Sequence, residues 1–104
     1  MKQHKEVTCE DGFTVSIQAS SGNYCEPRID DADFWESVEL GYPSQADWLI
    51  IGYAEDKDTP TETVYGWVPV HTVYLLLTKH GGVVSGEVPK GVPVYGKQFP
   101  RENK

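Results

Sequence analysis

Hydrophobic and polar residues alternate along two stretches of the chain, residues 13–20 and residues 35–42. In the first stretch the apolar positions point one way and the polar positions the other, which is typical of a half-buried β-strand. In the second stretch Ser37 and Glu39 are expected to face outward, while three residues share the opposite face: Val38, Leu40 and Tyr42. The pattern therefore predicts two strands, each with one side against a core.

Other segments have the composition of strands without clear alternation. Residues 48–54 are a nearly continuous run of apolar, aromatic and β-branched residues, which favours a central strand covered on both faces. Residues 63–68 predict a further strand, and residues 83–84 restart an extended segment. Residues 92–95 predict an edge strand, because Pro93 is tolerated only at the edge of a sheet.

One segment, at about residues 70–80, predicts an α-helix. Its apolar residues recur with the 3.6-residue spacing that places them on one face: Val70, Val73, Tyr74 and Leu77. Pro69 suits the start of a helix, where its missing N–H donor does no harm. Gly81 and Gly82 suit the left-handed turn that commonly ends one.

Together these elements predict an α+β fold, with an antiparallel sheet of about four to six strands and one helix packed on a face. The length of 104 residues suits a single domain, 1–104. The polar ends, residues 1–8 and 98–104, are expected to be flexible. Because one helix cannot cover a whole sheet, the other face must be polar, capped by loops or used for association.

Charge is distributed unevenly along the chain. Residues 26–62 contain eleven carboxylates and two cations, a formal charge of −9, whereas the rest contains five carboxylates and seven cations, a charge of +2. A broad negative surface repels nucleic acid and anionic lipid and attracts cationic surfaces. We therefore expect the carboxylates of residues 26–62 to gather into one negative surface, and we expect no direct binding to nucleic acid.

Candidate contacts for a cationic partner lie in two acidic segments. A tryptophan directly follows the acidic run at residues 30–33, and an exposed Trp ringed by acids would anchor an Arg- or Lys-rich partner. The predicted partner-binding residues are Asp30, Asp31, Asp33, Trp35, Asp56 and Asp58. Two alternatives stay open: the acidic segments are solvated loops without a partner, and Trp35 begins a strand and is buried.

Catalytic and metal-binding patterns are weak. There is no Cys-x-x-Cys pair, and His71 and His80, nine residues apart on the predicted helix, would lie on opposite sides of it. The carboxylates do not match the calcium loop of an EF-hand. We predict no metal and no cofactor. A Cys25 nucleophile with His71 as its base stays as an alternative, although nothing nearby in the sequence would lower the pKa of the thiol.

The chain has no apolar run long enough to span a bilayer, and its N-terminus lacks the apolar core of a secretory signal. We therefore expect a cytoplasmic protein that makes no contact with a membrane. In that compartment Cys9 and Cys25 are expected to be free thiols. The sequence is compatible with a monomer or a homodimer.

Five segments between residues 13 and 82 carry a resemblance to known sequences: Ser16-Ile17-Gln18-Ala19-Ser20, Tyr24-Cys25-Glu26-Pro27-Arg28, Val38-Glu39-Leu40-Gly41-Tyr42-Pro43-Ser44, Tyr65-Gly66-Trp67-Val68-Pro69-Val70 and His80-Gly81-Gly82. They resemble small uncharacterised proteins encoded in bacteriophage and prophage genomes. The resemblance implies a short, acidic, single-domain binder of host machinery, similar in size and charge to anti-CRISPR and other anti-defence proteins. It supplies no catalytic residues.

The leading expectation is a non-enzymatic interaction module that binds a basic surface of a host protein, one that handles nucleic acid or acts in defence. Its first alternative is a small phage structural or assembly protein that self-associates through its sheet. Its second alternative is a small-ligand binder, or an enzyme that uses Cys25 and His71.

Overall fold

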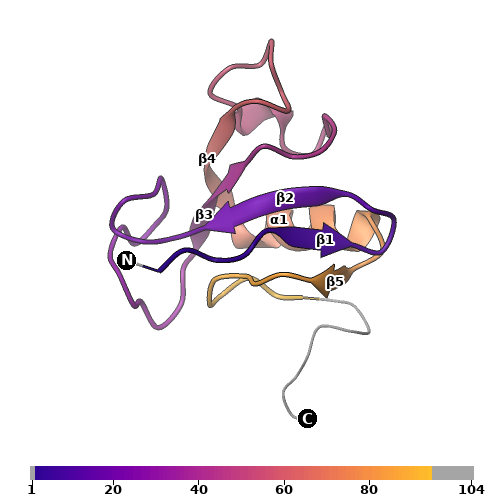
Figure 1. The fold of residues 1–104 in the computed structure, drawn as a ribbon. Helices are drawn as coiled ribbons and strands as arrows, with labels where there is room; N and C mark the ends of the chain where they lie inside the picture. The colour runs from indigo at the N-terminus through magenta and orange to yellow at the C-terminus, as the bar shows by residue number, and fades with distance from the viewer. Residues whose placement is uncertain (1, 95–104) are drawn as a thin grey trace.

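The fold is one antiparallel five-stranded sheet with a single helix packed against it, as the sequence predicts (Figure 1). A computed structural model describes residues 2–94. Along the sheet the strands lie in the order β4-β3-β2-β1-β5. Their bounds are β1 Val7–Cys9, β2 Thr14–Gln18, β3 Ser37–Gly41, β4 Val64–Pro69 and β5 Val83–Ser85, and the helix α1 spans Val70–Lys79.

The two alternating stretches form the centre of the sheet. β2 and β3 pair with Ile17 opposite Leu40, and on the next strand Leu40 lies opposite Tyr65. These side chains are fully buried and face a core that includes Val73, Leu76 and Leu77 of α1. One predicted inward position is wrong. Tyr42 lies beyond the end of β3 with φ +51° and is 57% exposed, because the chain turns before its side chain can continue the pattern.

Strand β1 overlaps residues 1–8, which the sequence predicts to be flexible. Val7 and Cys9 are buried between β2 and β5. Even His4 is nearly buried, since its backbone N–H and C=O both bond the side chain of Gln18 at 2.8 Å. The prediction for residues 1–8 is therefore wrong from His4 onward. A three-residue strand is too short to show alternation, and its pairing with distant strands supplies its stability. Residues 98–104 lie outside the described part.

The predicted central strand at residues 48–54 is also wrong. This segment is a turn followed by a short 3₁₀ helix, η1 Ile51–Tyr53, and Trp48 is 74% exposed. Asp47 explains the difference. Its side chain accepts the N–H of Leu49 at 2.9 Å, and its backbone carbonyl accepts the N–H groups of Ile50 and Ile51 at 3.1 Å. An Asp that satisfies the following backbone donors favours a turn over a sheet ladder.

The helix follows β4 without a loop, so Pro69 is both the last residue of the strand and the N-cap of α1. α1 ends at Lys79 with His80 as its C-cap, and Gly81 then has the predicted left-handed φ of +94°. The predicted edge strand at 92–95 is absent from residues 92–94, where the N–H of Val92 closes a turn onto Pro89. Tyr95 lies outside the described part. Among residues 2–94 no helix has the length and apolar character needed to cross a bilayer.

Candidate partner-binding site

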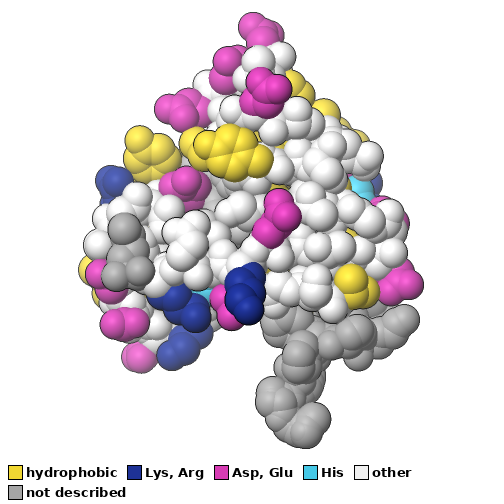
Figure 2. Space-filling view, viewed as in Figure 1, with side chains coloured by type: hydrophobic (Ala, Val, Ile, Leu, Met, Phe, Trp, Pro, Cys, Tyr) yellow, Lys and Arg dark blue, Asp and Glu magenta, His cyan; other side chains and the backbone are white. Residues whose placement is uncertain are grey.

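The acidic residues do not form the single negative surface that the sequence suggested. The loops of residues 19–36 lie at the left of the sheet, whereas the loop of residues 55–62 projects beyond β4 at the top (Figure 1). Figure 2 shows carboxylates gathered on the upper loop, a second group at the lower left with Lys and Arg side chains among them, and hydrophobic side chains between the two groups. Asp47 is buried and belongs to neither group. Sequence proximity of charges does not fix their proximity after folding.

The predicted contact residues are therefore divided between two places. Asp30 and Asp31 line a pocket together with Lys2 and Lys90, so their charge is partly balanced locally. Trp35 lines the same pocket but is only 4% exposed, so it is buried, as the alternative expected, although it precedes β3 and does not begin the strand. The prediction of Trp35 as an exposed anchor is wrong.

Exposed aromatic side chains gather instead beside β4. Tyr24, Tyr53 and Trp67 line a groove of about 320 Å³, and the other lining residues include Glu55. The three aromatic residues are 36%, 37% and 51% exposed, respectively. We call this the aromatic groove. Sequence reasoning missed it because its residues come from three separate segments, two of which have the composition of buried strands.

A break in the strand register turns Trp67 outward. The pairing of β3 with β4 shifts between Val38 and Leu40, opposite the stretch that contains Gly66 and Trp67. At this shift Trp67 adopts φ +50°, a left-handed conformation that is uncommon for a bulky residue and costs on the order of 1–3 kcal/mol. Strained residues of this kind cluster at binding and active sites, where other interactions hold them in place.

Those other interactions are visible around Tyr24. Its carbonyl accepts the N–H of Trp67 at 3.0 Å, and its own N–H bonds the carboxylate of Glu39 at 2.8 Å. The rings of Tyr24 and Trp67 stack with their centroids 4.9 Å apart. Gly66 makes room for this, because a Cβ there would lie 3.3 Å from the Cβ of Tyr24. The two rings are thus held in a fixed arrangement before any partner binds.

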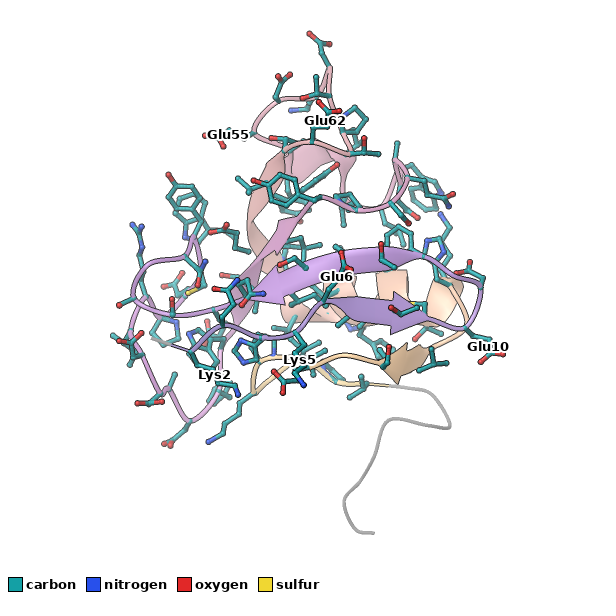
Figure 3. All side chains as sticks on the ribbon, in the orientation of Figure 1. Lys2, Lys5, Glu6, Glu10, Glu55 and Glu62 are labelled. Carbon is teal, nitrogen blue, oxygen red and sulfur yellow. The ribbon has the colours of Figure 1, made fainter. Side chains whose placement is uncertain are left out.

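Negative charge lies directly beside these rings. Glu55 lines the groove and begins the loop of residues 55–62, which has four carboxylates and one lysine: Glu55, Asp56, Asp58, Glu62 and Lys57. Figure 3 shows Glu55 and Glu62 projecting from this loop at the top of the molecule. The loop is internally bonded, for example from the N–H of Asp58 to the side chain of Asp56 at 3.0 Å. The guanidinium of Arg28 also lies close to the stack, 5.1 Å from the centroid of the Tyr24 ring.

A second polar cluster surrounds His80, at the end of α1. Nδ1 of His80 lies 2.7 Å from Asp11, and Nε2 lies 2.9 Å from Asp47, which also bonds Lys79 at 3.1 Å. Both ring nitrogens of His80 therefore lie within hydrogen-bond distance of a carboxylate. Phe13 stacks on the imidazole at 3.9 Å between centroids. The cluster ties three distant segments together, which is a structural task.

Ionisation within this cluster follows its hydrogen bonds. Burial opposes the charge on Asp47, but bonds from Leu49, His80 and Lys79 outweigh it and lower the pKa of the carboxyl. The backbone N–H of Phe13, and then His80, likewise lower the pKa of Asp11. Within the described residues no group of three or more metal-ligating side chains is placed to hold an ion.

The catalytic alternative gains little from the geometry. Cys25 is buried in the loop that follows β2, and its thiol bonds the carbonyls of Ser20 and Pro27 at 3.2 and 3.4 Å. Burial raises the pKa of this thiol, which disfavours the nucleophilic thiolate. His71, its suggested base, lies on α1 and packs against Tyr74. Cys9 is a buried free thiol too, and burial raises its pKa to about 11.

Comparisons with known proteins add no assignment to this picture. No family model, no curated protein and no solved structure matches the chain. Interpretation of the site therefore rests on its own geometry, in which the aromatic groove combines exposed rings, a rigid frame and adjacent negative charge.

Proposed function

We propose that this chain is a non-enzymatic binding module that takes a Lys or Arg side chain of a basic partner protein into the aromatic groove. The observation that supports this most is the stacked pair Tyr24–Trp67, held half-exposed on a strained backbone beside the carboxylate of Glu55. A cation over the face of Trp or Tyr is attracted by the ring quadrupole, by about 0.5–1 kcal/mol at exposed sites and more when water is excluded. A neighbouring carboxylate adds a charge-assisted hydrogen bond.

The loop of residues 55–62 supplies the longer-range part of the attraction. Its four carboxylates exceed its one cation by three charges, and the loop extends from the groove at the top of the molecule (Figures 1 and 3). Such a field raises association rates, and added salt weakens it. In this proposal Asp56 and Asp58 steer the partner, and the rings hold it. A host protein that handles nucleic acid presents a surface of the matching charge.

Self-association through the sheet has less support. The outer edge of β4 is already bridged, since Ala54 pairs with Tyr65 and the N–H of Glu55 bonds the carbonyl of Val64 at 2.9 Å. The opposite edge strand, β5, has three residues. Sedimentation equilibrium of the free protein separates the two proposals, because the assembly alternative requires a defined oligomer.

Binding of a defined basic probe tests the proposal. An arginine-rich peptide with blocked ends is titrated into the protein at low and high salt, and the affinity is measured by calorimetry. We expect Trp67→Ala to weaken binding about tenfold or more, and Glu55→Gln to weaken it and reduce its salt dependence. Trp48→Ala is the matched control, since Trp48 is the more exposed tryptophan, at 74%, and lies outside the groove. Equal losses from Trp67→Ala and Trp48→Ala, or no salt-sensitive binding at all, would remove the proposal.

A further inference from the structure

A separate pocket of about 430 Å³ lies away from the aromatic groove and shares no lining residue with it. Its lining residues come from four segments that are distant in sequence and lie within residues 2–4, 19–20, 30–35 and 87–90. Figure 3 places Lys2 at the lower left of the molecule, whereas Glu55 and Glu62 lie at the top. The volume falls within the range of small-molecule sites, about 300–1,000 Å³.

Backbone hydrogen bonds hold these walls together. The N–H of Trp35 bonds the carbonyl of Lys90 at 2.8 Å, and the N–H of Glu87 bonds the carbonyl of Lys5 at 3.1 Å. On another wall, the N–H of Ser21 bonds the carboxylate of Asp30 at 3.0 Å. Gly91 allows the close approach, because a Cβ there would lie 2.5 Å from the carbonyl oxygen of Trp35. The pocket is therefore part of the folded frame and needs no induced closure.

The lining presents both signs of charge on different segments. Asp30 and Asp31 come from the loop before β3, while Lys90 comes from the turn after β5 and Lys2 from the N-terminal segment. Among the described residues, neither Asp31 nor Lys90 forms a hydrogen bond or an ion pair through its side chain. Lys2 contacts Glu87 at 3.8 Å, with both side chains well exposed. Opposite charges that line one pocket without pairing are available to a ligand of both signs.

Apart from Glu87, which contacts Lys2, the remaining surface is apolar or uncharged. Trp35, Ala32 and Val88 contribute to the lining, and the imidazole of His4 completes it. Burial lowers the pKa of His4, with a contribution from Lys2, so the ring is neutral near pH 7. The neutral ring lines the pocket without adding charge to it.

We propose that this pocket binds a small zwitterionic molecule of about the size of a dipeptide. Its ammonium group faces the carboxylates of Asp30 and Asp31, its carboxylate faces the ammonium of Lys90, and its side chains lie against Trp35 and Val88. This proposal corresponds to the small-ligand binding that the sequence left as an alternative. It does not depend on the aromatic groove. No chemical step is implied, because binding alone accounts for the arrangement.

Nuclear magnetic resonance titration with a defined probe tests this inference. The free dipeptide alanyl-phenylalanine is added to isotope-labelled protein, alongside two analogues in which either the amino group is acetylated or the carboxyl group is amidated. We expect saturable shifts at Ala19, Ser20, Ala32 and Val88 with the free dipeptide. Either blocked analogue should bind about tenfold more weakly, a difference of about 1.4 kcal/mol.

Matched variants locate the charges. Asp31→Asn and Lys90→Met should each weaken binding of the free dipeptide about tenfold, and Asp33→Asn should not, since Asp33 belongs to the same loop but does not line the pocket. The spectrum of each variant reports whether it is folded. Shifts of equal size with all three probes, equal effects of Asp31→Asn and Asp33→Asn, or an absence of shifts would each overturn the proposal. Trp67→Ala should leave this titration unchanged. Failure of the dipeptide proposal can therefore be distinguished from failure of the partner-binding proposal.

Discussion

Replacing Asp47 by alanine should be among the most damaging single changes to the described part of the protein. The side chain of Asp47 is 2% exposed, and it accepts hydrogen bonds from three groups: the N–H of Leu49 at 2.9 Å, Nζ of Lys79 at 3.1 Å and Nε2 of His80 at 2.9 Å. After removal of this carboxylate, its partners differ in whether they can reach water. Lys79 is 38% exposed and can turn to water, whereas the imidazole of His80 is 4% exposed and cannot.

The size of the effect follows from the hydrogen bonds that lose their acceptor. A buried polar group left without its partner costs about 1–3 kcal/mol. Two of the three groups, the N–H of Leu49 and the imidazole of His80, depend on Asp47 in this way. Asp11 still bonds the other ring nitrogen of His80 at 2.7 Å, which argues for the lower part of that range for each group. A domain of this size has about 5–15 kcal/mol of total stability, and about 1 kcal/mol shifts its melting temperature by roughly 4–8 °C. We therefore expect Asp47→Ala to cost about 2 kcal/mol and to lower the melting temperature by at least about 8 °C.

Thermal and urea unfolding, followed by circular dichroism, measure this loss. The matched control is Asp33→Ala, an exposed loop carboxylate whose removal should change the free energy of unfolding by less than about 0.5 kcal/mol. In a double-mutant cycle, Asp47→Ala combined with His80→Ala should cost less than the sum of the single changes, since the second change removes the imidazole that the first leaves without its partner. The reasoning fails if Asp47→Ala and Asp33→Ala have similar melting temperatures, or if the two changes at the His80 cluster are additive.

Three further outcomes follow from the structure. Trp67→Gly should keep the free energy of unfolding within about 1 kcal/mol of the original, because glycine relieves the strain at φ +50° while the ring is lost. The same change should abolish binding of the basic peptide, because the ring is removed. Urea unfolding measures the first effect and calorimetry the second. The free energy of unfolding in urea should fall as the pH drops below 6.5, because the pKa of His4 is lowered in the folded protein. It should fall again below pH 3.8, as the depressed pKa of Asp47 is approached. His4→Gln should remove the first loss, and a free energy of unfolding that is independent of pH over both ranges would contradict this account. The thiols of Cys9 and Cys25 should react with a chromogenic disulfide reagent only as fast as the protein unfolds, because both are buried with raised pKa values; rapid reaction of either thiol in the folded protein would be the contrary result.

Local pattern was sufficient for much of the fold. Alternation located β2 and β3, and the 3.6-residue spacing located α1, because the order of apolar residues within each of these elements shows which of its faces is buried. Strand β1 gave no such signal, since three residues cannot establish a period and its burial depends on the strands beside it. The error at residues 48–54 arose from reading apolar content as strand, where Asp47 bonds the following backbone and produces a turn.

The sites were harder to predict than the elements, because each depends on which distant segments meet. The aromatic groove needs the register shift in β4 to turn Trp67 outward and the loop after β2 to bring Tyr24 alongside it. Charge counting identified the loop that contains Asp56 and Asp58, but it could not show that Asp30 and Asp31 lie elsewhere, beside Lys2 and Lys90. A buried Trp35 and an exposed Trp67 have no distinguishing mark in the sequence itself.

Resonance mapping of a bound basic peptide tests the central claim most directly. On titration of an arginine-rich peptide into isotope-labelled protein, we predict that the largest shifts fall on Tyr24, Tyr53, Glu55 and Trp67, with smaller ones along residues 56–62. Shifts centred on residues 30–35, or spread evenly over all exposed carboxylates, would mean that the aromatic groove is not where this protein holds a cationic partner.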